Sequence, residues 1–172
     1  LLTGDPCSGA VAAPELDPAS RDFFSGGGGL GLYLLHRSTT SRTSSADPEN
    51  PLIFSPGPLG GVPQFPGTSK CMAVSLSPLT GIPGVSNFGG HFGAYLKYAG
   101  FDALQISGKS AREVMLVIDG FRREVSLVEA PAGDHVFDLE REIAGRFVVA
   151  GYDRKDIAFL STGIGAARTA YG

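Results

Sequence analysis

Apolar residues recur at helical spacing in four stretches of the chain. The first two, ASRDFF and GLGLYLLH, place apolar side chains about every three to four residues, which is typical of one buried helix face. The third, HFGAYLKYA, leads to a glycine suited to end a helix. The fourth, VFDLEREIAGRF, is amphipathic. The pattern therefore predicts helices over residues 18–24, 29–37, from about Gly90 to Gly100, and 136–147.

Short apolar runs between turn residues predict the strands. The opening LLTGD has the form of a strand end entering a turn, and the Asp-Gly pair at 119–120 joins two alternating runs as in a β-hairpin. The predicted strands are 52–55 (closed by Pro56), 71–76, 103–107, 113–118, the hairpin partner 123–129, and 157–161. Because strands and helices mix without a regular βαβ period, the expected fold class is α+β, with mixed, largely antiparallel sheets and a few helices.

Length and composition are those of a soluble globular domain. The chain has 172 residues, 42% hydrophobic and 18% charged, which is enough for a single domain over 1–172 with its own core. A net charge of −3 gives no electrostatic case for nucleic acid, and no apolar run approaches the ~20 residues that span a bilayer. The two distant cysteines, Cys7 and Cys71, favour a reducing cytoplasm over a disulfide framework. We find no ligand spacing for zinc or an iron–sulfur cluster.

Charge is distributed unevenly along the chain. Residues 51–110 hold only 4 of the 31 charged residues, but 11 of the 25 glycines and 7 of the 12 prolines. By contrast, residues 111–172 have the charge density of an ordinary domain surface. The middle third is therefore expected to be either deeply buried or shaped around a ligand.

The stretch GGGGLG formally contains the GxGxxG pattern, at Gly26, Gly28 and Gly31. A dinucleotide site needs a strand before the pattern and a ribose-binding acid ~20 residues after it. Here the preceding RDFF looks helical, and Asp47, the nearest downstream acid, lies in a predicted loop. The context favours a helix-to-helix turn in which glycine supplies positive φ.

The stretch SPLTGIPGVSNFGGHFG places Asn87, Gly89 and Gly90 just before a predicted helix. Backbone N–H groups at helix starts and in glycine turns bind anions, phosphate above all. Asn87 is suited to cap the helix, and its amide oxygen is also a ligand for a hard cation such as Mg²⁺. A phosphate site and a purely structural helix start are both open here.

Two cationic candidates and one loop add to this picture. Lys70 is the only Lys, Arg, Asp or Glu between Glu49 and Lys97, so it is either an anion or cofactor contact or an ordinary surface lysine. His91 is a possible proton donor, but a histidine at a helix start is more often structural. The loop STGIGAARTAYG, with Arg168, either flanks the same ligand or is a frayed C-terminus.

Taken in order, these motifs resemble one family, the tungsten-dependent aldehyde:ferredoxin oxidoreductases, at their N-terminal domain. The matching segments are FFSGGGGLGLYLL, DPENPLIFSPGPLGG, PGTSKCMAVSLSPLTG, SNFGGHFGAYLKYAGFDALQISGKS and VMLVIDG. Their order and spacing make the resemblance specific over about residues 20–120. It continues weakly to the end of the chain.

The resemblance implies a base on which a tungsten bis-molybdopterin (tungstopterin) cofactor sits, its phosphates bridged by Mg²⁺. By this resemblance Asn87 helps to hold the Mg²⁺ and the phosphates, and Gly89 and Gly90 lie beside the pterin. Lys70 stands where the family usually has an arginine that bridges the pterin and a [4Fe–4S] cluster, and Gly28 also replaces a usual arginine. Lysine keeps the charge but lacks the planar fork of arginine, which puts the bridge in question.

The resemblance also implies that this chain is one piece of a larger enzyme. The cluster cysteines and the acid and histidine residues near tungsten belong to later domains of the family, so no catalytic residue is assigned here and the chain alone is expected to be inactive. The whole enzyme is expected to oxidise a small aldehyde to a carboxylic acid and to pass electrons to ferredoxin. Alternatives are a reductase of aromatic acyl-thioesters and a non-catalytic binding or assembly module that joins a partner chain.

Overall fold

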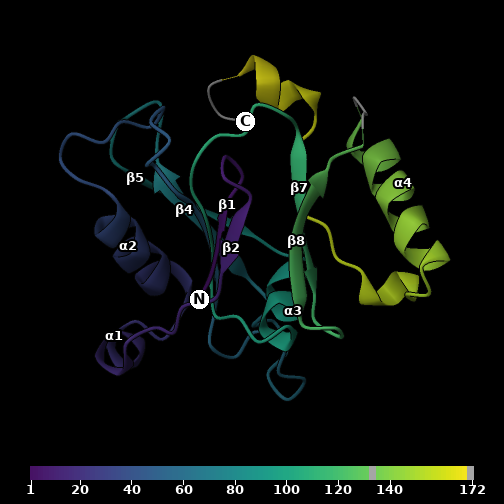
Figure 1. The fold of residues 1–172 in the computed structure, drawn as a ribbon. Helices are drawn as coiled ribbons and strands as arrows, with labels where there is room; N and C mark the ends of the chain where they lie inside the picture. Colours follow the sequence, from purple (N-terminus) through teal and green to yellow (C-terminus); the bar gives the residue numbers. More distant parts are fainter. Residues whose placement is uncertain (132–134, 170–172) are drawn as a thin grey trace.

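The computed structural model describes residues 1–131 and 135–169, which form the expected α+β fold. A six-stranded mixed sheet forms the centre, and a separate β-hairpin lies against it (Figure 1). The elements are β1 (Leu2–Asp5), β2 (Ala10–Ala12), α1 (Pro18–Phe23), α2 (Gly27–Ser38), β3 (Leu52–Pro56), β4 (Cys71–Leu76), β5 (Pro83–Phe88), α3 (Phe92–Tyr98), β6 (Leu104–Ile106), β7 (Val114–Asp119), β8 (Glu124–Glu129) and α4 (Val136–Val149), followed by 3₁₀ turns at Arg154–Asp156 and Ile164–Arg168.

The sheet has the strand order β2-β1-β6-β3-β4-β5. Only the β1–β6 pair is parallel, and every other neighbouring pair is antiparallel. The three strands β3, β4 and β5 follow one another along the sheet in chain order. Since β5 is an edge strand, one side of its backbone has no strand partner in the described part of the chain.

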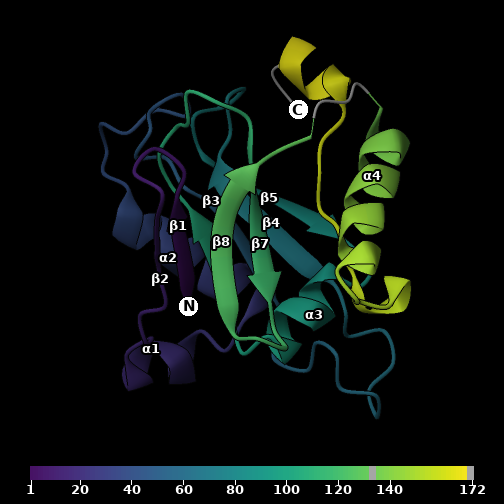
Figure 2. The same cartoon turned by 45° about the vertical axis from the view of Figure 1, so that its right-hand side comes forward.

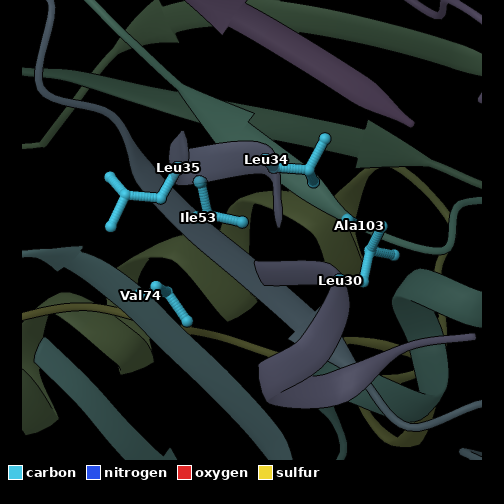
Figure 3. Packing of buried hydrophobic residues seen from close by; sticks show 6 residues of the cluster. All are labelled: Leu30, Leu34, Leu35, Ile53, Val74 and Ala103. Atoms are coloured by element: carbon cyan, nitrogen blue, oxygen red, sulfur yellow. The ribbon is translucent and has the colours of Figure 1, made fainter. Parts of the chain in front are cut away.

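Helix α2 covers one face of the sheet. Its apolar residues at helical spacing, Leu30, Leu34 and Leu35, pack with Ile53, Val74 and Ala103 in a buried cluster (Figure 3). The helix approaches β4 closely at Gly31, where an added Cβ would lie 2.6 Å from Val74 Cγ2. A glycine at this point therefore sets the distance between helix and sheet.

The opposite face of the sheet carries α3 and the β7–β8 hairpin (Figures 1 and 2). Its core contains Leu2, Phe54, Cys71, Leu96 and Leu104, against which Leu116, Ile118 and Val125 of the hairpin pack. Helix α4 lies beyond the hairpin and buries Ile143 and Ala144. The order of layers is thus α2, sheet, hairpin with α3, and α4.

Most of the predicted elements are confirmed, but one predicted strand is absent and two strands were not predicted. Residues 157–161 form no strand; Ile157, Phe159 and Leu160 instead line an apolar cavity of about 520 Å³ with α3, the hairpin and α4. Conversely, β5 occupies a stretch for which no strand was predicted. Its glycine and proline favour turns, but pairing with β4 forms a strand. The short strand β2 was also missed. None of the helices in the described residues has the length and apolar character needed to cross a bilayer.

The close approach at Gly31 leads to a stability prediction. Gly31→Ala should lower the free energy of unfolding by about 1–2 kcal/mol, because the new methyl group must displace Val74 in a packed core. Gly145→Ala in α4 is the matched control, since its Cβ meets nothing within 4 Å. It should raise stability by about 0.5–1 kcal/mol through helix propensity. Urea unfolding monitored by circular dichroism measures both, and a Gly31→Ala protein as stable as the parent would contradict the packing argument.

Candidate functional site

The ends of three strands meet at one end of the sheet. In the antiparallel register, Pro56 of β3 pairs with Cys71 of β4, and Cys71 pairs with Phe88 of β5. Lys70, just before β4, and Gly89, just after β5, are therefore brought to the same end of the sheet. Lys70 Nζ lies 3.9 Å from the position that a Cβ on Gly89 would take. The fold thus places two of the sequence-predicted site residues side by side.

The glycines after β5 leave backbone accessible beside Lys70. Gly90 has φ +85°, a conformation that favours glycine, and an added Cβ there would meet nothing within 4 Å. Both Gly89 and Gly90 are exposed. They connect β5 to His91, the residue that precedes α3. The result is open backbone next to one ammonium group, an arrangement that suits an anion.

Asn87 lies within β5 and not at a helix start, so its predicted capping role is wrong. It pairs with Met72 across the β4–β5 ladder and is exposed, while His91 is the residue at the N-cap of α3. The reason is that strand pairing continues to Phe88, and the chain then needs both glycines to turn toward α3. The amide of Asn87 remains available to a ligand at the same end of the ladder as Lys70.

The glycine-rich start of α2 lies over the same end of the sheet. An added Cβ at Gly26 would lie 2.7 Å from the carbonyl oxygen of Pro56, and no side chain caps the helix. Gly27 and Gly28 have open space around their Cβ positions. Because α1 and not a strand precedes this segment, the helix-to-helix turn is confirmed and the dinucleotide pattern lacks its strand.

Gly93 was given no role in the sequence analysis, but it contributes to the shape of the site. An added Cβ at Gly93 would lie 3.2 Å from both the Ser69 carbonyl oxygen and Cys71 Cβ. The first turn of α3 therefore presses against the start of β4. The only signal in the sequence was the high frequency of glycine through 84–93, which does not say which glycine makes the contact.

Lys70 is exposed and has no ion-pair or hydrogen-bond partner among the described residues. Lys97, by comparison, is paired with Asp102. An unpaired ammonium beside exposed glycine backbone suits an anionic group. No group of three or more His, Cys, Asp or Glu side chains that could hold a metal ion occurs in residues 1–131 and 135–169. A cation here would depend on the Asn87 amide and on oxygens of the ligand itself.

The loop with Arg168 is not brought to this end of the molecule. The turn Ile164–Arg168 lies at the top of Figures 1 and 2, whereas α3, which follows Gly90, lies near the bottom in both views. The predicted second flank of the ligand is therefore not formed by these described residues. Residues 170–172, the end of that predicted loop, lie outside the described part of the chain.

Cys71, next to Lys70, is buried between the sheet and α3. Burial raises the pKa of its thiol to about 12, because the thiolate would lose its hydration. The group is thus protonated at neutral pH and serves as a small apolar core residue. It is neither a nucleophile nor a thiolate ligand for a metal in this state.

Comparisons with known proteins agree on one family. Residues 5–171 match the family described as aldehyde ferredoxin oxidoreductase, N-terminal domain. The tungsten-containing aldehyde ferredoxin oxidoreductase of Pyrococcus furiosus is 34% identical over 143 residues, which are 83% of this chain and 23% of that protein. The corresponding protein of Pyrococcus horikoshii is 37% identical over 113 residues, or 66% of this chain and 18% of that protein. The chain thus spans about a fifth of the length of these relatives.

Two further proteins that this chain resembles carry names that describe other reactions. The aliphatic sulfonate oxidoreductase, WOR-like subunit, of Pyrococcus furiosus is 39% identical over 122 residues, which are 69% of this chain and 19% of that protein. Among solved structures, the active-site complex BamBC of benzoyl coenzyme A reductase with 1,5-dienoyl-CoA matches with a TM-score of 0.80 and 28% identity. That match covers 86% of this chain and 22% of the other.

The different surroundings of the two cysteines lead to a prediction. In the folded protein at about pH 8, Cys7 should react with a thiol reagent within minutes and Cys71 should not, because only Cys7 is exposed and the Cys71 pKa of about 12 leaves almost no thiolate. A Cys7→Ser variant should therefore be unreactive until it is unfolded in guanidinium, when one thiol per chain should appear. Fast labelling of folded Cys7→Ser would contradict the burial of Cys71.

Proposed function

The chain belongs to the family of aldehyde ferredoxin oxidoreductase N-terminal domains, and from this premise we propose that it is the cofactor-binding domain of a tungstopterin and iron–sulfur oxidoreductase. The whole enzyme oxidises a small aldehyde to a carboxylic acid with ferredoxin as electron acceptor. The observation that carries the proposal is the unpaired Lys70 beside the open backbone of Gly89. The two free cysteines suit a reducing cytoplasm as its location.

The residues at this end of the sheet suit the phosphate groups of a molybdopterin. Lys70 supplies a positive charge, and Gly89 and Gly90 let a ligand approach the backbone where a side chain would block it. Asn87 supplies one amide oxygen for Mg²⁺, which usually keeps several waters and takes phosphate oxygens as further ligands. A single protein side chain is therefore a sufficient contribution at such a site.

In this proposal the chain's own residues bind and orient, and they perform no redox step. Lys70 neutralises phosphate charge, and the glycines fix how close the cofactor comes to the sheet. The tungsten–pterin group, when bound, supplies the two-electron chemistry of aldehyde oxidation. Under this proposal the ligands of the [4Fe–4S] cluster belong to other domains of the enzyme. Residues 1–131 and 135–169 hold no group of three or more His, Cys, Asp or Glu side chains that could bind a metal ion.

Exposed apolar side chains occur at both ends of the β4–β5 pair and support a covering partner. Leu59 and Phe65 lie in the loop between β3 and β4, and Leu79 and Ile82 lie in the turn between β4 and β5, at the end away from Lys70. Val85 of β5 is exposed as well. Exposed apolar surface of this kind marks an interaction surface when its side chains gather into one patch. We infer that the remaining domains of the enzyme, or a partner chain, cover it and enclose the cofactor.

A second candidate function is reduction of an aromatic acyl-thioester. It is favoured by the structural similarity to the active-site complex of benzoyl coenzyme A reductase. Both candidates use the same base domain, so the residues near Lys70 do not separate them. A non-catalytic module that keeps only the phosphate site is the third alternative, and the replacement of both family arginines, by Lys70 and Gly28, fits that reading.

Cofactor content tests the proposed site directly. Natively purified protein should contain tungsten and pterin and have a mass well above 17.8 kDa, the mass of this chain. Lys70→Ala and Asn87→Ala should each reduce bound tungsten and pterin about tenfold, since a lost charge-assisted contact is worth about 1.5–3 kcal/mol. Lys70→Arg should retain them, and Lys109→Ala, an exposed lysine outside the site, is the matched control. Protein without metal and pterin would support the non-catalytic module, and full cofactor content in both alanine variants would exclude the site.

Turnover assays separate the two enzymatic candidates. The holoenzyme should reduce ferredoxin with small aldehydes and release the corresponding carboxylic acids. Under the second candidate it would instead act on aromatic acyl-CoA thioesters and show no aldehyde-dependent ferredoxin reduction. The measurement is the initial rate with each substrate class at equal enzyme concentration, with apoprotein as the blank.

A further inference from the structure

The apolar cavity of about 520 Å³ lies between parts of the chain that are far apart in sequence. Its walls come from α3, from β7 with the turn that follows it, from α4, and from residues 156–161, which run between the hairpin and α4 (Figure 2). Small-molecule sites in proteins have volumes of roughly 300–1,000 Å³, so this cavity has room for a ligand. The residues of the proposed cofactor site do not line it, so its role is independent of the proposed function.

Aromatic rings from several elements line the cavity. Phe92 and Tyr95 belong to α3, Phe147 belongs to α4, and Tyr152 and Phe159 follow α4 in the chain. The rings of Phe147 and Tyr152 meet edge to face, with centroids 6.0 Å apart. A further flat ring can pack against such surfaces in offset or edge-to-face geometry, and burial of its apolar area favours binding.

The tyrosine hydroxyls of the lining already have partners. Tyr95 donates a hydrogen bond to the backbone oxygen of Lys155, and Tyr98 donates one to the backbone oxygen of Gly61. The hydroxyl of Tyr152 donates to the Asp119 carboxylate. A strongly polar ligand would lose its hydration here and find few free hydrogen-bonding groups in return, so the lining favours an apolar ligand.

Charge on the lining excludes an anion. Among the described residues that line the cavity, the Lys, Arg, His, Asp and Glu side chains are two carboxylates, Asp119 and Asp156. Burial alone would raise the pKa of Asp119, but hydrogen bonds from Tyr152 and from the backbone N–H groups of Arg122 and Phe121 lower it below its usual value. Asp119 is therefore ionised at neutral pH, and a negatively charged ligand would be both desolvated and repelled.

Arg122 reduces the attraction of the cavity for a cation. Its Nε lies 3.8 Å from the Asp119 carboxylate, and its guanidinium carbon lies 5.7 Å from the ring centroid of Tyr152. A cationic ligand would thus meet a carboxylate and an aromatic face that already have a positively charged partner. An uncharged ligand is the kind that this lining fits.

We propose that the cavity between α3, β7 and α4 is a binding site for a small uncharged aromatic molecule. Burial of the ligand's apolar surface against the aromatic lining holds it in place, and the carboxylates select against anions. Because the ligand contacts α4 and β7 together, its binding also stabilises the docking of α4 on the hairpin. Thermal unfolding should therefore shift to higher temperature as the ligand concentration rises.

The two methionines of the chain allow a direct test on the 172-residue protein. Met115 lines the cavity, whereas Met72 of β4 packs against the α2 core. The probe is N-phenyl-1-naphthylamine, an uncharged aromatic compound that fluoresces more strongly in apolar surroundings. The chain has no tryptophan, so this fluorescence is read with little protein background. With carbon-13 methyl labels on methionine, the probe should shift the Met115 signal saturably and leave the Met72 signal in place, with Met72→Leu assigning the two.

A charged probe and a filled cavity provide the controls. The sulfonate 8-anilinonaphthalene-1-sulfonate has the same rings and one negative charge, and it should bind at least about tenfold more weakly. Val117→Phe places a larger side chain on the lining and should weaken binding of the uncharged probe about tenfold. Val85→Phe, the same change on the exposed face of β5 outside the cavity, is the matched control and should bind as the parent does.

Each outcome decides for or against the site. Absence of probe binding, or saturable fluorescence without a shift of the Met115 signal, would refute it. Equal affinity for the two probes would refute selection for an uncharged ligand. A Met115 signal that changes with protein concentration in the absence of probe would show that a second copy of the chain occupies the cavity, which also refutes the proposal. If Val117→Phe fails to fold by circular dichroism, the Met115 shift and the sulfonate comparison decide. Tungsten and pterin content enters none of these results, so the proposed function stands or falls separately.

Discussion

The antiparallel register of β3, β4 and β5 is the constraint on which the rest of the site depends. Each residue of β4 is held opposite one residue of each neighbour, so the ends of the three strands coincide at Pro56, Cys71 and Phe88. A shift by one residue would turn Val74 away from α2 and move Lys70 away from Gly89. The buried faces on both sides of the sheet resist such a shift, because Val74 is needed in one core and Cys71 in the other.

Glycine serves two different purposes in this structure. At Gly31 and Gly93 the missing side chain lets a helix pack closely on β4. This packing forms the two cores that hold β4 in register with its neighbours. At Gly27 and Gly90 the space around the Cβ position is empty and φ is positive, so these residues add nothing to packing. Alanine would be strained at such φ values, so glycine is the residue that fits these positions. These glycines leave an open surface at the end of the sheet.

Sequence patterns predicted the elements with internal periodicity and missed those defined by their partners. Helix α2 and strand β4 were predicted because their own residues repeat at the right spacing, and both are confirmed. Strand β5 was not, since its glycine and proline suggest turns and only pairing with β4 makes it a strand. The same error placed Asn87 at a helix start, whereas the structure has it within β5. The proximity of Lys70 to Gly89 could not be predicted from any local sequence pattern, because it follows from the register of β4 and β5.

In the proposed site, a lysine at position 70 would hold an anion differently from an arginine. An arginine would offer a planar fork of donors and fix the orientation of a phosphate by itself, whereas an ammonium offers a point charge with little directional preference. Orientation must then come from the surroundings. The backbone at Gly89, beside the Lys70 ammonium, is a feature of that kind. Gly28, with open space where the family usually has a second arginine, adds no competing charge. In the proposed site, these departures from the family pattern would concentrate anion recognition on the β4–β5 end of the sheet.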